Sequence, residues 1–207
     1  MSPVPKGAGI VQCYIRRNKS GTNKLFPVYS LFLKDERFLL MSKKRPNNKT
    51  SNYLISMTEG DLSRDGENFV GKLRSNFVGT DFQIYDNGVN PKDNPSASQG
   101  QVRKELGSVM YAANVLGSRG PRKMQAAIPA VDENNEMVLS GPGGKDILHK
   151  LKDREYRDLV YLINKPPRWN EQVGAYVLNF NGRVTMASVK NFQLVDPDEQ
   201  NTGNFLV

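Results

Sequence analysis

The clearest structural signal in this chain is the stretch Phe38-Leu-Leu-Met-Ser-Lys-Lys-Arg-Pro-Asn-Asn-Lys-Thr-Ser-Asn-Tyr53. Two short apolar runs flank a basic segment that contains no acidic residue. Pro46-Asn47-Asn48 has the composition of a turn, because proline presets a turn dihedral and asparagine tolerates turn conformations. The stretch therefore predicts a strand, a turn and a second strand, with cations gathered at the bend.

Positive charge is concentrated in the first quarter of the chain. Residues 1–58 hold 11 Lys and Arg but only 2 Asp and Glu, a net charge of +9, whereas the other 149 residues hold 18 and 19, a net charge of −1. A local excess of this kind attracts polyanions. The candidates are nucleic acid, an anionic membrane and a phosphorylated head group, and the alternative is a set of solvated charges on strand ends and turns.

The composition indicates one turn-rich domain. The 207 residues include 18 Gly and 12 Pro, which favours β structure. The single Cys13 cannot form an internal disulfide or a zinc site, and with no secretory leader in view we expect a reducing intracellular compartment. We expect the lone His149 on the surface of a helix. No apolar run approaches the ~20 residues of a membrane-spanning helix, so we expect any membrane contact to be peripheral.

Alternating or apolar runs predict a series of short strands. These runs are 10–16, 25–33, 38–44, 53–57, 69–77, 81–85, 102–115, 125–131, 159–163, 173–180 and 183–189. Asn87-Gly88 and Asn181-Gly182 predict tight turns, the second of which joins the last two strands into a hairpin. Lys72 and Arg74 lie two residues apart, so we expect both on one side of their strand. Residues 145–154 have the apolar spacing of an amphipathic surface helix.

Several short motifs occur in order along the chain. The most specific are Lys72-Leu-Arg-Ser-Asn76 and Gly79-Thr-x-Phe-x-x-Tyr-Asp-Asn-Gly88. The other motifs are Lys49–Ser56, Asp61–Arg64, Asn114–Gly117, Gly120–Met124, Asn164–Asn170 and Tyr176–Gln193. Together they resemble the Tubby and Tubby-like protein family. Because the motifs follow one another over nearly the whole chain, the chain is identified as a member of that family.

The resemblance implies a mainly β fold, a closed antiparallel barrel in which twelve strands surround a central apolar helix, with one or two short surface helices. We expect residues 1–7 to be a disordered lead-in and residues 8–207 to form the Tubby-like domain. Phe205-Leu-Val207 resembles the opening of a further strand, after which the family's core helix is missing, so we expect a C-terminally truncated domain. An unfilled lumen costs about 24 cal/mol per Å³ in one studied series, which predicts marginal stability.

The resemblance also implies a function and the residues that carry it. Family members bind phosphoinositides, above all phosphatidylinositol 4,5-bisphosphate, through cations on the barrel surface, as adaptors in signalling or in membrane and ciliary receptor trafficking. Arginine forks and lysine point charges both suit phosphate. The expected primary contacts are Lys43, Lys44, Arg45 and Arg74, although the family's cationic pair on the first strand leaves open which two of the three adjacent cations bind. The expected secondary basic contacts are Lys49, Lys72, Arg16 and Arg17.

The expected partners are this lipid, the anionic inner leaflet of the plasma membrane, and trafficking or signalling proteins. The expected location is cytoplasmic and peripheral at the plasma membrane, with the nucleus and the cilium as further sites. The alternative function is that of a DNA-binding transcription modulator, against which stands the lack of a base-reading motif. We expect no enzyme activity, no metal and no cofactor, because the chain has no Gly-x-Ser-x-Gly motif and its His149 is isolated.

Overall fold

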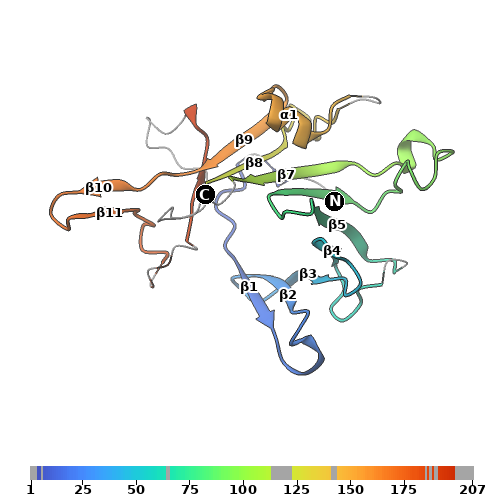
Figure 1. The fold of residues 1–207 in the computed structure, drawn as a ribbon, viewed down its shortest axis with the longest axis horizontal. Helices are drawn as coiled ribbons and strands as arrows, with labels where there is room; N and C mark the ends of the chain where they lie inside the picture. The colour runs from blue at the N-terminus through green and yellow to red at the C-terminus, as the bar shows by residue number, and fades with distance from the viewer. Residues whose placement is uncertain are drawn as a thin grey trace.

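A computed structural model of the chain describes residues 4–5, 7–63, 66–112, 123–140, 144–184, 186, 188 and 191–198. Ten strands form one antiparallel sheet in the order β1-β2-β3-β4-β5-β6-β7-β8-β9-β12, and β10 pairs with β11 in a separate two-stranded sheet (Figure 1). The large sheet consists of β1 (Cys13–Asn18), β2 (Val28–Leu33), β3 (Phe38–Lys44), β4 (Asn52–Ser56), β5 (Phe69–Ser75), β6 (Asp81–Asp86), β7 (Glu105–Tyr111), β8 (Met124–Pro129), β9 (Leu159–Asn164) and β12 (Leu194–Val195). The mainly β class predicted from the composition is therefore confirmed.

The sheet is a meander, because each strand from β1 to β9 pairs with the next one along the chain. The connections after β1, β3 and β5 therefore lie at one end of the strands, and the connections after β2, β4 and β6 lie at the other. Two short 3-10 helices, η1 (Gly21–Asn23) and η2 (Gln99–Gln101), lie in these connections.

Strand boundaries differ from the predicted ones where side chains compete for the backbone. β5 ends at Ser75 rather than at Phe77, because the Asn76 side chain accepts hydrogen bonds from the Thr80 and Asp81 N–H groups at 3.0 and 3.3 Å. Asparagine side chains stabilise turns in this way. The apolar Phe77 and Val78 therefore belong to the turn and not to the strand.

The helix α1 (Ile147–Asp153) confirms the amphipathic pattern. It begins after Asp146, whose carboxylate accepts from the His149 N–H at 2.7 Å, a standard N-cap. Leu151 is 1% exposed and packs with Ile147 and Ala127 in the core between α1 and β8. His149 lies on the exposed side of the helix, as expected.

One sequence prediction is not confirmed and another is wrong. The sheet is not closed, because among the described residues its edge strands β1 and β12 do not pair with each other; the closed barrel is thus not confirmed. The predicted hairpin of 173–180 with 183–189 is wrong. Instead β11 (Ala175–Val177) pairs with β10 (Arg168–Asn170), and the two form the hairpin labelled apart from the large sheet in Figure 1.

The β10–β11 turn is stabilised by Asn170, whose side chain accepts from the Val173 N–H at 3.1 Å. Gly174, with a φ of 64°, completes that turn. Because of this turn, β11 pairs with β10, which precedes it, and not with a strand after the Asn181-Gly182 turn on which the prediction was based. Several other predictions, including the Asn114–Gly117 motif, most of the lead-in and Phe205–Val207, lie outside the described residues.

Candidate functional site

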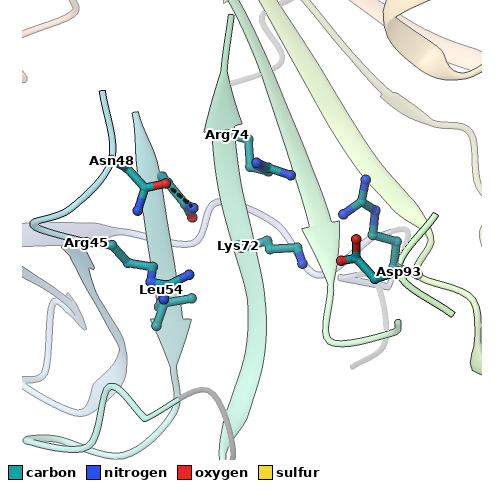
Figure 2. A pocket seen from close by; sticks show the side chains of 8 residues that line it. Arg45, Asn48, Leu54, Lys72, Arg74 and Asp93 are labelled. Carbon is teal, nitrogen blue, oxygen red and sulfur yellow. Dashed lines mark hydrogen bonds between the residues drawn. The ribbon is translucent and has the colours of Figure 1, made fainter. Parts of the chain in front are cut away.

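A pocket of about 170 Å³ lies on one face of the sheet, beside β4 and β5 (Figure 2). It is lined by cationic and amide side chains together with one carboxylate and one leucine: Arg45, Asn48, Asn52, Leu54, Lys72, Arg74, Asp93 and Arg103. Figure 2 shows Lys72 and Arg74 extending from β5 toward the side on which Asp93 lies, while Arg45 and Asn48 lie across β4. The pocket is therefore a cationic depression in the sheet surface.

The strand register explains why these side chains meet. Lys43 and Lys44 of β3 lie opposite Leu54 and Tyr53 of β4, and the Arg45 N–H continues the ladder by donating to the Asn52 carbonyl at 2.8 Å. Asn52 in turn lies opposite Arg74. Side chains directly opposite each other share one face of a sheet.

The next cross-strand row extends the same face. Leu54 lies opposite Lys72 of β5, and Lys72 lies opposite Tyr85 of β6. The prediction that Lys72 and Arg74 share one side of their strand is thereby confirmed. The Asn52–Arg74 row and the Leu54–Lys72 row thus lie side by side on the face of the sheet that carries the pocket.

The electrostatics of the lining favour an anion. Four of the eight lining residues are cationic and one, Asp93, is acidic. Lys72 is only 8% exposed, and its surroundings therefore screen charge less than bulk water does. The Arg103 Nη1 and the Asn52 Oδ1 are buried without a hydrogen-bond partner among the described residues. A buried donor left in this state is costly, and an anionic ligand in the pocket would satisfy it.

Arg103 is the functional candidate that the sequence did not reveal. It lies between η2 and β7, and its guanidinium is 4.2 Å from the centroid of the Tyr85 ring, a cation–π contact. Burial raises the pKa of the Tyr85 phenol, so the ring remains neutral beneath the cation. Arg103 and Tyr85 are far apart in sequence, and no spacing rule links them. Tyr85 and Arg103 meet only because the connection from β6 to β7 folds back over the sheet.

The other primary residues lie differently. Lys43 is on the pocket side of β3, yet its Nζ donates to the Asn23 Oδ1 at 2.8 Å and it does not line the pocket. Lys44 points to the opposite face of the sheet, because consecutive strand residues alternate between faces. Of the four expected primary contacts, the structure therefore places Arg45 and Arg74 together in the pocket.

The expected secondary basic contacts also lie partly inside and partly outside the pocket. Lys72 lines the pocket, and Lys49 lies in the β3–β4 turn without lining it. Arg16 and Arg17 are on β1, where their guanidinium groups lie over aromatic rings: Arg16 is 4.9 Å from the Phe32 ring and Arg17 is 5.4 Å from the Tyr29 ring. These two contacts hold both arginine side chains on the β1–β2 hairpin, which β3 separates from β4.

The described part of the chain contains no group of three or more His, Cys, Asp or Glu residues placed to hold a metal ion. None of the helices in that part is both long enough and apolar enough to cross a bilayer.

Comparison with known proteins identifies a family and several relatives of the chain. It matches the Tub family over residues 1–207. It is 49% identical to mouse Tubby-related protein 2 over 95% of this chain and 36% of that protein. It is 46% identical to human Tubby-related protein 1 over 96% of this chain and 38% of that protein. It is also 46% identical to human Tubby-related protein 3, over 95% of this chain and 47% of that protein. The chain thus spans less than half the length of these relatives. On this evidence the chain belongs to the Tub family.

Proposed function

We propose that the chain binds the head group of a phosphoinositide, above all phosphatidylinositol 4,5-bisphosphate, in the pocket between Arg45 and Arg103. The observation that carries the proposal is the convergence of three guanidinium groups and one ammonium group, from three separate segments, on a pocket of about 170 Å³. Guanidinium forks and ammonium groups are the side chains that bind phosphate best. The activity proposed is binding, without catalysis.

The arrangement of these cations favours a compact polyanion over a nucleic acid. Arg45 and Arg74 are exposed at the rim, and Lys72 is buried deeper, so the positive charge surrounds a depression. Duplex DNA presents one charge per ≈ 1.7 Å along a rod and is bound by extended basic surfaces. A phosphorylated sugar ring instead presents several phosphates to one concave site. The Asn52 Oδ1, which no described residue engages in a hydrogen bond, adds an acceptor suited to a ring hydroxyl.

From head-group binding follows a role at a membrane. The chain would lie on the cytoplasmic face of the plasma membrane, as a peripheral adaptor in signalling or in trafficking that includes the cilium. The net charge of +9 in residues 1–58 supports this role, because each cation near an anionic leaflet contributes about 1 kcal/mol. Trafficking or signalling proteins would be its further partners.

The test compares binding to vesicles with binding to the free head group. Wild-type protein and an Arg45→Gln/Arg74→Gln variant are sedimented with phosphatidylcholine vesicles that contain phosphatidylinositol 4,5-bisphosphate, and titrated with soluble inositol trisphosphate in a calorimeter. Each lost charge-assisted hydrogen bond costs at least about 1.5 kcal/mol, or roughly tenfold in affinity. We expect the double variant to lose about a hundredfold in both assays.

The matched control is Arg16→Gln/Arg17→Gln, which removes the same charge on β1 and should retain binding of inositol trisphosphate. Vesicles in which phosphatidylserine supplies the same total charge should bind the wild type more weakly. Equal binding by the wild type and the Arg45/Arg74 variant would contradict the proposal. A DNA duplex that displaces inositol trisphosphate at physiological salt would favour the DNA-binding alternative.

A further inference from the structure

Two large apolar side chains project into solvent at the turn between β5 and β6. Phe77 is 82% exposed and Val78 is 77% exposed. Single exposed apolar residues are common on protein surfaces, but two adjacent ones at a turn tip are a costly arrangement in water. Their position calls for a partner that covers them in the functional state.

The turn that carries them is held by a dense set of hydrogen bonds. The Asn76 N–H donates to the Asp81 carbonyl at 3.0 Å, and the Asn76 side chain donates to the Thr80 Oγ1 at 2.9 Å. Gly79 has a φ of 71°, a conformation that glycine adopts without strain. These contacts stabilise the turn in which Phe77 and Val78 point into solvent.

The same turn is joined to the basic turn between β3 and β4. The Ser75 N–H donates to the Ser51 carbonyl at 2.9 Å, and the Ser51 N–H donates to the Ser75 Oγ at 3.0 Å. Arg74, which lines the pocket, immediately precedes Ser75. The apolar tip and the Arg45–Arg74 side of the cationic pocket therefore lie at one end of the sheet, and residues 45–51 and 76–80 contain no acidic residue.

The β1–β2 connection adds a third apolar side chain at this end. Leu25 is 83% exposed. Its neighbour Asn23 accepts a hydrogen bond from the Lys43 Nζ at 2.8 Å, which places this connection against the last residues of β3. In the β4–β5 connection, at the opposite end, the described residues 57–63 and 66–68 contain three acidic residues and no lysine or arginine. This connection thus differs in charge from the β3–β4 and β5–β6 turns.

We propose that the Phe77–Val78 turn inserts into the interface of an anionic lipid bilayer while the adjacent pocket holds a phosphoinositide head group. The proposal rests on the function proposed above and adds the orientation in which the protein meets the membrane. Head groups are attached to the bilayer surface, so a pocket that holds one brings its own rim to the interfacial layer. Stable peripheral attachment combines an apolar insertion with electrostatic attraction, and aromatic side chains are favoured in the interfacial layer.

A double variant, Phe77→Ser/Val78→Ser, separates insertion from head-group recognition. Because both side chains are exposed, the variant should fold like the wild type, which circular dichroism verifies. We expect its affinity for vesicles of phosphatidylcholine and phosphatidylinositol 4,5-bisphosphate to fall by about tenfold or more, while its affinity for soluble inositol trisphosphate is unchanged. The matched control is Met57→Ser, a 54% exposed side chain at the acidic end of β4, which should leave vesicle binding unchanged.

A fluorescence measurement checks the insertion directly. In a Trp169→Phe background, which removes the single native tryptophan, Phe77→Trp should shift its emission to the blue on addition of these vesicles and be quenched by brominated acyl chains. Met57→Trp in the same background should show neither change. An unshifted Phe77→Trp on bound protein, or full vesicle affinity in the double variant, would overturn the insertion and leave the head-group site standing. A wild type that binds neither inositol trisphosphate nor these vesicles would overturn both.

Discussion

Asn52 of β4 lies directly opposite Arg74 of β5, and both side chains line the pocket, where the buried Asn52 Oδ1 has no hydrogen-bond partner in the described part of the chain. The pair combines an acceptor with a cationic donor in one cross-strand row. The Asn52 Nδ2 donates to the Asn48 Oδ1 at 3.2 Å, so the nitrogen and not the oxygen of this amide is used in the β3–β4 turn. A ligand that carries both hydroxyls and phosphates matches this row, because hydroxyls need acceptors and phosphates need donors.

The neighbouring cations Lys44 and Arg45, at and just after the end of β3, should differ in their effect on head-group binding. Arg45 lines the pocket, whereas Lys44 lies on the opposite face of the sheet. We expect Arg45→Gln to weaken the binding of inositol trisphosphate by roughly tenfold, the effect of about 1.5 kcal/mol, and Lys44→Gln to change it by less than about twofold. Calorimetric titration measures both. Equal losses in the two variants would mean that overall charge, and not the pocket, determines the affinity.

Arg103 should prove to be a ligand-binding residue. Its Nη1 is buried and has no hydrogen-bond partner within the described chain, so a phosphate oxygen would gain a donor that is already desolvated. We expect Arg103→Gln to reduce affinity for inositol trisphosphate by roughly tenfold or more and to reduce the rise in melting temperature that the ligand produces. Lys104→Gln, which removes the same charge from an exposed neighbour outside the pocket, is the control. Similar losses in both variants would assign the effect to long-range charge.

Asp93 should oppose the binding of anions, since it is the acidic member of the lining. Removal of a like charge close to a bound phosphate is favourable, although an exposed site is partly screened by salt. We expect Asp93→Asn to raise affinity for inositol trisphosphate by about two- to fivefold, with a larger gain at low ionic strength. Glu59→Gln, a matched loss of charge in the β4–β5 connection outside the pocket lining, should have no effect. Weaker binding after Asp93→Asn would instead show that this carboxylate positions a cation.

We expect the free energy of unfolding to depend on pH through the carboxyl group of Glu105. Burial raises the pKa of this carboxyl above its ordinary value of 4.5, although it accepts hydrogen bonds from Ser108, Gln83 and the Ile147 N–H. A raised pKa means that the folded state holds the proton more tightly than the unfolded state does. By linkage, the stability that this proton provides is complete below pH 4.5 and is lost as the pH rises through the folded-state pKa.

The experiment measures the free energy of unfolding of the wild type and of Glu105→Gln in urea at several pH values from just below 4.5 upward. We expect the difference, wild type minus variant, to decrease as the pH rises. Glu136→Gln, at an exposed position, is the control and should show a constant difference. An increasing difference for Glu105→Gln would mean that its hydrogen bonds, rather than burial, determine its pKa.

Local patterns in the sequence determined the strands and the helix. Short apolar runs gave the sites of β2 to β9, the spacing of Ile147, Leu148 and Leu151 gave α1, and alternation placed Lys72 and Arg74 on one face. Each of these inferences depends on residues a few positions apart, because the period of a helix or a strand determines which of their side chains share a face. The motif order further identified the family, which the comparison confirmed.

Contacts between segments that are distant in the chain could be decided only by the tertiary structure. The register of β3 with β4 turned Lys44 away from the pocket, and the connection after β6 brought Arg103 over Tyr85. The β10–β11 pairing was also missed, because two turns competed for the same strand. A change of one residue in register moves a side chain to the other face of a sheet, so charge and spacing alone do not determine which cations converge.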